Sequence, residues 1–250
     1  LEKAFGEYGI PYYTDAKKSL AQHPLAKFVL AWLACVAEGF DPADADAFAG
    51  SEFFGTDRRT REEFRNYLLK YANYRGGVKR PIKEEAKAPP MLYAARERFL
   101  SAFDGASASM PGGRYCALLR RLLEKFECEA VQEKIVSDLA KAGAIAESEY
   151  FSKGCEGVMR VLGELEELSG DLKLRAEEFA AVLGGGLEGL EISLIPQYLD
   201  AVFVGDIAQS KKSASKVVFA ARMTDAVPAC GADTALISDR DIVRLRLLQV

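Results

Sequence analysis

The sequence has no long uninterrupted apolar run, and this absence excludes a membrane-spanning helix. The best candidate, residues 24–37, is interrupted by Lys27 and is shorter than the roughly 20 apolar residues that a bilayer requires. No basic segment leads into an apolar one near Leu1, so no secretory signal is recognisable. We therefore expect a cytoplasmic protein without membrane contact, and we expect the chain to begin and end inside a longer gene product.

Histidine is nearly absent, and the cysteines are scattered. His23 is the one histidine, and no two cysteines form a C-x-x-C pair. The five cysteines are Cys35, Cys116, Cys128, Cys155 and Cys230. This distribution argues against a zinc or iron–sulfur site and favours ordinary buried, reduced thiols. His23 precedes a proline at a predicted helix start, where a capping or surface role is expected rather than catalysis.

A phosphate-binding loop of the form G-x-x-x-x-G-K-[ST] is also missing, so the chain alone should not hydrolyse ATP. Gly184, Gly186 and Gly189 satisfy G-x-G-x-x-G, but they follow a predicted helix and precede a predicted strand. That order is the reverse of a dinucleotide-binding turn, so we interpret them as a flexible connection. The carboxylates of Glu164, Glu166 and Glu167 fall on one polar helix face and are assigned no catalysis. No catalytic and no metal-binding residue is predicted.

What the sequence contains is mostly helical pattern. With 250 residues and 49% hydrophobic content, it can form a substantial core, while its formal charge of −4 offers no overall attraction to nucleic acid. Apolar spacing and glycine stops predict helices over 1–8, 24–38, 61–74, 91–103, 113–126, 129–142, 156–168 and 176–183. The Asp- and Ala-rich stretch 41–46 is expected to be a turn, and 79–90 a linker.

Short β-branched runs suggest a sheet at both ends of the helical part. Extended segments are expected at 9–13, 191–195, 201–204 and 216–220. The predicted fold class is therefore α/β but predominantly helical. Residues 1–40 would supply the first part of an α/β domain, 41–183 a helical insertion, and 184–250 the return to the same domain. Continuity of the sheet across the insertion is a hypothesis.

Three segments carry a resemblance to a known family. Residues 1–13, LEKAFGEYGIPYY, followed by His23, Pro24 and Leu25, resemble the "lE..l...gIPy" stretch in the second motor domain of UvrD-like helicases. The phrase ISLIPQYLDAVFVGD at 192–206 resembles the "lDqVfvGd" strand of the B subunit of AddAB-type ATP-dependent helicase/nucleases. EFRNYLLKY at 63–71 is similar to the "lENYvlkyG" segment of that family.

The resemblance implies a superfamily 1 helicase-like second motor domain with a large helical insertion. The segment matching helicase motif V contains Asp200, Val202, Phe203, Val204, Gly205 and Asp206. It also implies a non-motor accessory subunit that positions DNA during double-strand break processing for recombinational repair. Its implied partners are a motor/nuclease A subunit and single- or double-stranded DNA. The parent complex would use ATP and Mg²⁺, with an iron–sulfur cluster conceivable outside this chain, which alone should be inactive and need no cofactor.

Two departures from the family pattern weaken the implied anion site after the motif V strand. Lys211 and Lys212 occupy the place where "d.sR" is usual, which replaces a planar guanidinium by point charges. Farther on, the usual "G.n.G.lP" turn keeps Pro228 but loses both glycines.

The strongest nucleic-acid candidate from residues alone is a tyrosine stripe followed by cations. Tyr67, Tyr71 and Tyr74 recur at helical spacing, and they precede a basic loop. The loop's cations are Arg75, Lys79, Arg80 and Lys83. Aromatic faces can stack on bases while cations hold phosphates. In the alternative, the tyrosines form a half-buried packing stripe and the cations lie in a solvated loop. This alternative is favoured, because aromatic stripes on helices usually serve packing.

A second candidate is the Ser-rich loop with Lys211, Lys212 and Lys216, for which a solubilising role is equally compatible. For the whole chain, the rival to DNA positioning is a protein-interaction scaffold that docks the motor subunit without touching DNA.

Overall fold

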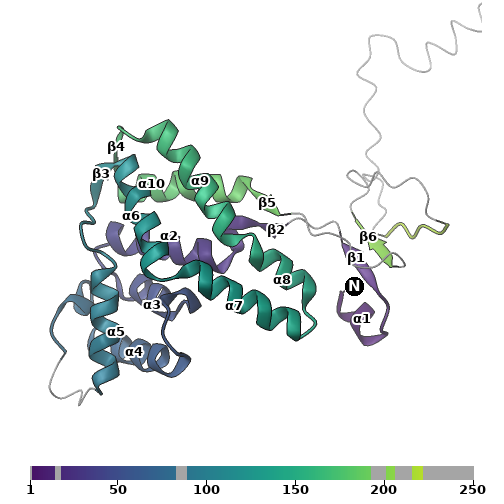
Figure 1. Ribbon diagram of the computed structural model, residues 1–250, viewed down its shortest axis with the longest axis horizontal. Coiled ribbons are helices and arrows are strands. Elements are labelled where there is room, and N and C mark those ends of the chain that lie inside the picture. The colour runs from purple at the N-terminus through teal and green to yellow at the C-terminus, as the bar shows by residue number, and fades with distance from the viewer. Residues whose placement is uncertain (1, 15–17, 83–88, 193–200, 206–215, 222–250) are drawn as a thin grey trace, which may run out of the picture. The chain divides into compact units, whose positions relative to one another are not determined.

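The computed structural model describes residues 2–14, 18–82, 89–192, 201–205 and 216–221. The chain divides into two units, Leu1–Gly205 and Asp206–Val250. The described part of the first unit is predominantly helical, as the sequence predicts (Figure 1). The second unit contributes only residues 216–221, which form neither helix nor strand.

The described chain begins with a short helix and two strands, continues through the remaining helices, and ends with two further strands. The α-helices are α1 (Glu2–Glu7), α2 (Pro24–Ala37), α3 (Pro42–Gly50), α4 (Arg58–Tyr71), α5 (Pro90–Ser101), α6 (Gly112–Lys125), α7 (Cys128–Lys141), α8 (Ile145–Ser152), α9 (Gly154–Ser169) and α10 (Ala176–Gly189). Short 3₁₀ turns are η1 (Leu20–Gln22), η2 (Glu52–Phe54) and η3 (Gly77–Lys79). The strands are β1 (Tyr12–Thr14), β2 (Lys18–Ser19), β3 (Ser109–Pro111), β4 (Lys173–Arg175), β5 (Glu191–Ile192) and β6 (Val202–Val204).

Helix starts follow local capping chemistry. The Asp57 carboxylate accepts from the Thr60 amide and so starts α4 three residues earlier than the apolar pattern predicts. The predicted turn at 41–46 is wrong, because Asp41 caps a helix there and Pro42 occupies its first turn. Every predicted helix exists, with ends shifted by a few residues.

The glycine-rich end of α10 corrects a second expectation. Gly184, Gly186 and Gly189 lie within the helix rather than in a flexible connection. A Cβ on Gly186 would lie 2.8 Å from Val161 Cγ1, so α10 approaches α9 too closely for a larger residue. Leu183 and Leu187 are fully buried on either side, and their burial offsets the intrinsic cost of glycine in a helix.

The strands form two-residue and three-residue ladders. β1 pairs in parallel with β6, Tyr12 opposite Val202 and Thr14 opposite Val204, which joins segments that lie on either side of the whole helical part in sequence. β2 pairs with β5, and β3 with β4, both antiparallel. The strand predicted at 216–220 is wrong: these residues form no ladder in the described chain, and Val217, Val218 and Phe219 are exposed. The pairing joins the two flanks in one two-stranded sheet, in line with the hypothesis of continuity, while the domain boundaries at 40 and 183 stay a prediction.

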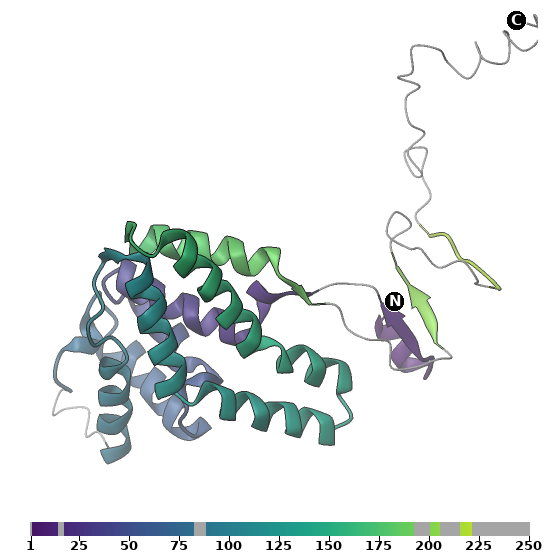
Figure 2. The same cartoon turned by 45° about the horizontal axis from the view of Figure 1, so that its top comes forward.

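The helices pack around one core. α2 contacts α3, α9 and α10, so the helix that precedes the predicted insertion packs against helices that lie wholly or partly within it. A phenylalanine cluster fills one part of this core, and it consists of Phe28, Phe48, Phe53, Phe54, Phe64, Phe99 and Phe126. α4 and α5 lie at the end of the helical body opposite the tips of the α7–α8 hairpin (Figure 2).

The predicted cysteine environment is confirmed for the described thiols. Cys35, Cys116 and Cys128 are buried, Cys155 is half-buried, and all four are free; Cys230 lies outside the described residues. Burial raises the pKa of Cys128 to about 12, so this thiol stays protonated. Among the described helices, none combines the length and apolarity needed to cross a membrane.

Candidate nucleic-acid interface

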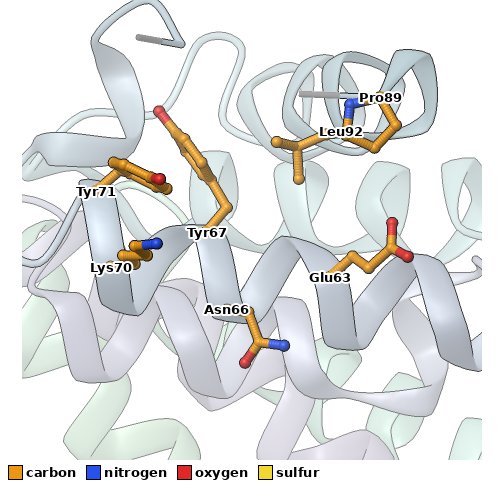
Figure 3. A pocket seen from close by; sticks show the side chains of 7 residues that line it. All are labelled: Glu63, Asn66, Tyr67, Lys70, Tyr71, Pro89 and Leu92. Carbon is orange, nitrogen blue, oxygen red and sulfur yellow. The ribbon is translucent and has the colours of Figure 1, made fainter. Parts of the chain in front are cut away.

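The predicted tyrosine stripe and basic loop lie together where α4 ends, η3 follows and α5 packs alongside. The packing of α5 on α4 brings Leu92 beside Tyr67, while Pro89 and Tyr71 border the same hollow farther apart (Figure 3). Lys83 lies outside the described residues. The surface that results is called the aromatic–basic corner, and its members are Lys70, Tyr71, Tyr74, Lys79, Arg80 and Tyr93.

The three predicted tyrosines have different environments. Tyr67 is only 5% exposed, and burial raises the pKa of its hydroxyl. Its ring stacks on Tyr71 with 5.7 Å between centroids, and Tyr71 is half-buried. Tyr74 is 41% exposed. The packing interpretation therefore holds for Tyr67, whereas Tyr74 presents its ring to solvent.

Tyr93 is a member that the sequence analysis missed. It lies on α5, is 50% exposed, and is close enough to influence the Tyr67 hydroxyl electrostatically. The signal was present in the sequence, because Leu92, Ala95 and Phe99 define the buried face of α5 and Tyr93 falls beside it. Exposed aromatic side chains from the segment after α4 and from α5 thus border the same surface.

Three cations of the corner lie over aromatic rings instead of pairing with carboxylates. Lys70 Nζ is 5.1 Å from the Tyr71 centroid, and Arg80 Cζ is 5.6 Å from that of Tyr74. Lys79 Nζ is 3.9 Å from the Phe40 centroid. Within the described part of the chain, none of these three cations has an ion-pair partner. Their charge is therefore available to an anion.

The remaining predicted cation differs. Arg75 Nη2 lies 3.2 Å from Glu38 Oε2, so its charge is already compensated. Three arginines along α4 are compensated in the same way, by Glu62, Glu63 and Asp46. Within the corner, the positive charge that has no ion-pair partner among the described residues thus lies at the end of α4 and in the loop after it; Arg61, at the start of α4, also has no carboxylate partner in the described chain but donates to the Thr56 carbonyl.

The loop that carries Lys79 and Arg80 is held in place by backbone contacts. The Gly76 amide donates to the Phe40 carbonyl at 2.9 Å, with Gly76 in the left-handed region at φ 72°. Arg96, from α5, donates from Nε to the Val78 carbonyl at 3.1 Å and from Nη2 to the Lys79 carbonyl at 2.7 Å. The Arg96 side chain is 13% exposed, so a largely buried guanidinium fastens the basic loop to α5.

A surface hollow of about 380 Å³ opens between α4 and α5 at this corner (Figure 3). Its lining includes Asn66, Tyr67, Lys70, Tyr71, Pro89 and Leu92. Lys70 extends beneath the Tyr71 ring, while Glu63 lies at the other end of the hollow and pairs with Arg59. Aromatic faces, an ammonium and a side-chain amide can stack on bases and hold phosphates. Among the described residues that line this hollow, none is arranged as a nucleophile beside a base.

Other predicted residues are only partly within the described chain. Val202, Phe203 and Val204 form β6 and Gly205 follows it, whereas Asp200, Asp206, Lys211 and Lys212 lie outside the described residues. Lys216 is exposed.

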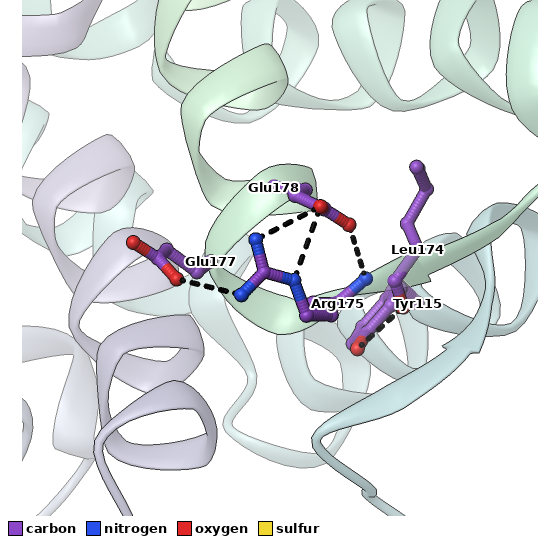
Figure 4. Close-up of polar contacts among 5 residues, drawn as sticks. All are labelled: Tyr115, Leu174, Arg175, Glu177 and Glu178. Atoms are coloured by element: carbon purple, nitrogen blue, oxygen red, sulfur yellow. Dashed lines mark hydrogen bonds and ion pairs between the residues drawn. The ribbon is translucent and has the colours of Figure 1, made fainter.

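The acidic residues of α9 and the start of α10 serve structural contacts. Glu166 pairs with Arg120, and Glu164 with Arg160. At α10, the Glu178 carboxylate accepts from the Arg175 amide at 2.8 Å and from its guanidinium, which also reaches Glu177 (Figure 4). The described residues contain no group of three or more His, Cys, Asp or Glu side chains placed to hold a metal ion.

His23 is a buried polar residue and not the surface histidine that the sequence allows. Nδ1 accepts from the Leu25 amide at 3.1 Å, which confirms the capping role, and Nε2 lies 3.3 Å from the Phe151 carbonyl. The side chain is fully buried, and this burial lowers the pKa of His23 to about 4. A neutral ring with the proton on Nε2 satisfies both contacts.

Comparison with known proteins gives a consistent answer. No family model matches the chain. Curated relatives are named as the B subunit of an ATP-dependent helicase/deoxyribonuclease: that of Moorella thermoacetica is 29% identical over 98% of this chain and 23% of its own length. The protein of Alkaliphilus oremlandii is 23% identical over 96% of this chain and 23% of its own length. The protein of Geobacillus kaustophilus is 25% identical over 100% of this chain and 24% of its own length. The resemblance that the sequence motifs predict is confirmed, and the chain spans about a quarter of the length of these relatives.

Proposed function

We propose that this chain is a segment of the B subunit of an ATP-dependent helicase/deoxyribonuclease, and that its aromatic–basic corner contacts single-stranded DNA. The assignment to the B subunit is supported by the names of the relatives, whose sequences align with nearly the whole chain. A complex so named acts on DNA and contains at least one further subunit. Its role would be to process broken DNA ends for repair.

The observation that carries the DNA contact is the arrangement of Lys70, Lys79 and Arg80. Each cation rests on an aromatic ring, and none is compensated by a carboxylate in the described chain. A phosphate can therefore be bound without first breaking an ion pair. The exposed rings of Tyr74 and Tyr93 supply faces on which bases stack without sequence preference.

The division of labour within the complex is also part of the proposal. This chain contains no phosphate-binding loop, so we propose that it acts as a non-motor accessory part and that ATP-driven translocation depends on residues outside it, such as those of a motor A subunit. ATP, Mg²⁺ and any iron–sulfur cluster would be held elsewhere in the complex. The superfamily 1 helicase-like ancestry of the flanks is supported by the parallel β1–β6 pairing.

The test is the affinity for a fluorescein-labelled oligothymidine, measured by anisotropy over a range of salt concentrations. We expect salt-sensitive binding that is weakened in the triple variant Arg75→Ala, Lys79→Ala, Arg80→Ala. The double variant Lys79→Ala, Arg80→Ala should lose nearly as much, because Arg75 is already paired. Removing two phosphate contacts should reduce the logarithmic salt slope by about 1.4.

The matched control is Lys134→Ala, Lys141→Ala, two exposed lysines on α7. It removes the same formal charge and should bind like the wild-type chain. Equal losses in the two double variants would mean that only net charge matters, and absent or salt-insensitive binding would overturn the DNA contact.

The scaffold function is a second candidate, because apolar side chains are exposed at the end of α9, in the segment after it and on α10. Leu168 is 83% exposed, Leu172 58% and Val182 50%. Such side chains are suited to docking a partner subunit. Co-purification with the A subunit, lost in a Leu168→Ser, Leu172→Ser variant while oligothymidine binding is absent, would favour the scaffold.

A further inference from the structure

A pocket of about 480 Å³ lies next to the aromatic–basic corner, between the end of α2, α5 and the turn that follows α5. Val36, Phe40, Leu100 and Phe103 form its apolar walls. Lys79 borders the same pocket, so one side chain is shared between the pocket and the corner. The pocket is therefore continuous with the surface proposed to contact DNA.

Two polar residues border this otherwise apolar space. The Lys79 ammonium rests on the Phe40 ring and has no ion-pair partner among the described residues. Ser107 is exposed at the rim, and its hydroxyl makes no hydrogen bond within the described chain; only its backbone carbonyl is used, by the Tyr115 hydroxyl. One cation and one free hydroxyl on apolar walls suit a ligand with a flat apolar body, a polar edge and an anionic group.

The backbone at Phe40 is strained in a way that fixes this wall. Phe40 has φ 64°, a conformation that bulky L residues rarely adopt, and it follows Gly39, also at φ 64°. The Phe40 amide donates to the Cys35 carbonyl at 2.8 Å, and its carbonyl accepts from Gly76 in the basic loop. The strained residue thus places its ring under Lys79 and ties α2 to the loop. Such strain is concentrated at functional sites.

We propose that this pocket holds one unpaired nucleotide of a bound single strand. Its base would lie between the apolar walls, with its edge toward the Ser107 hydroxyl and its phosphate on Lys79. This inference rests on the proposed function and names the ligand subsite within it. A nucleotide is favoured over an acidic peptide because Lys79 is followed directly by Arg80, whose guanidinium lies over Tyr74, and this series suits a repeating phosphate–base chain.

The chain contains its own reporter for the pocket. Trp32 is the only tryptophan, and its ring stacks on Phe103 with 5.6 Å between centroids and an interplanar angle of 3°. Thymidine 5′-monophosphate should therefore change Trp32 fluorescence saturably. Lys79→Met should weaken the nucleotide roughly tenfold, the size expected for one charge-assisted contact, and leave thymidine unchanged.

A pocket-filling variant keeps the test independent of stability. Ser107→Leu places a larger apolar side chain at the rim without removing a side-chain hydrogen bond, and it should abolish the nucleotide-dependent change. The matched control Ser137→Leu, at an exposed position of α7, should respond like the wild-type chain.

The outcomes separate this inference from the function on which it rests. Oligothymidine binding without a saturable Trp32 response to the nucleotide, or with an unchanged response in Ser107→Leu, overturns the pocket and leaves the corner intact. Loss of both kinds of binding overturns both. If an acidic–apolar peptide displaces the nucleotide and binds more tightly, the pocket is a protein-docking site and the nucleotide assignment fails.

Discussion

The phenylalanine cluster and the aromatic–basic corner are both built from aromatic rings, but the cluster rings pack mainly on one another, although Arg98 lies over Phe126 at 4.4 Å. In the cluster, Phe48 stacks on Phe28 at 4.7 Å and meets Phe99 edge-on at 5.4 Å, and all three are essentially unexposed. In the corner, rings face cations, and Tyr74 and Tyr93 remain open to water. The first arrangement satisfies each ring internally, whereas the second leaves ring faces and charges available to a ligand.

We expect the largest loss of stability for a substitution in the phenylalanine cluster. Phe48→Ala should lower the free energy of unfolding by about 3–5 kcal/mol, because it removes a fully buried ring and leaves a cavity among its neighbours. Tyr74→Ala is the matched substitution in the corner and should cost less than about 1 kcal/mol. Urea denaturation followed by circular dichroism measures both. Similar losses at the two positions would break the distinction between a packing ring and a presenting ring.

The next largest effect on stability is expected from the titration of His23, whose ring is buried like those of the cluster but is polar. Its pKa falls from 6.5 in the unfolded chain to about 4 in the fold, because burial penalises the charged form. Between these two pKa values the unfolded state binds more protons than the folded state. The contribution of neutral His23 to the free energy of unfolding is therefore fully present above pH 6.5 and is lost as the pH falls toward 4. The loss should approach about 3 kcal/mol.

Urea midpoints between about pH 7 and pH 4 test this, with His23→Asn as the control. Asparagine also caps a helix but does not titrate, so the variant should show a flatter pH dependence over that interval. A wild-type slope equal to that of His23→Asn would mean that other groups cause the acid sensitivity.

A smaller effect is expected at Arg96, which links the two kinds of region. Its guanidinium donates to the Val78 and Lys79 carbonyls, so Arg96→Ala should cost about 1–3 kcal/mol and weaken oligothymidine binding by loosening the basic loop. Arg96→Lys keeps the charge but cannot reach both carbonyls with a planar fork, so it should restore only part of the affinity. Anisotropy and urea denaturation on the same variants separate the two effects. Full affinity in Arg96→Ala would show that the loop needs no support.

Sequence periodicity located the helices because their apolar spacing records a buried face, as in α2, where Leu25, Phe28, Val29 and Trp32 are all buried. It missed α3, whose Ala- and Asp-rich sequence carries little apolar pattern and starts at the Asp41 cap. It ended α10 at Gly184, because the glycines there resemble a helix stop, and the contact that accounts for Gly186, the close approach of Val161, is far away in sequence.

The candidate site shows the same limit. The tyrosine spacing placed Tyr67, Tyr71 and Tyr74 on one helix, which is wrong for Tyr74, because α4 ends at Tyr71. The spacing also could not show which ring would be buried. That depends on α5, whose approach buries Tyr67 and brings Tyr93 to the same surface. Likewise, the sequence could not show that Arg75 pairs with Glu38 while Lys79 rests on Phe40, since both partners precede α3.

The smallest effect on stability is expected for the two cations of the basic loop, which are proposed to have a large effect on DNA binding. Lys79→Ala, Arg80→Ala removes two exposed contacts between cations and rings, each contributing about 0.5–1 kcal/mol at most, and breaks no ion pair in the described chain. The unfolding free energy should therefore change by less than about 2 kcal/mol, while oligothymidine affinity falls. A double variant that unfolds as readily as Phe48→Ala would make the two cations part of the packing, and the corner would then differ from the cluster only in its exposure.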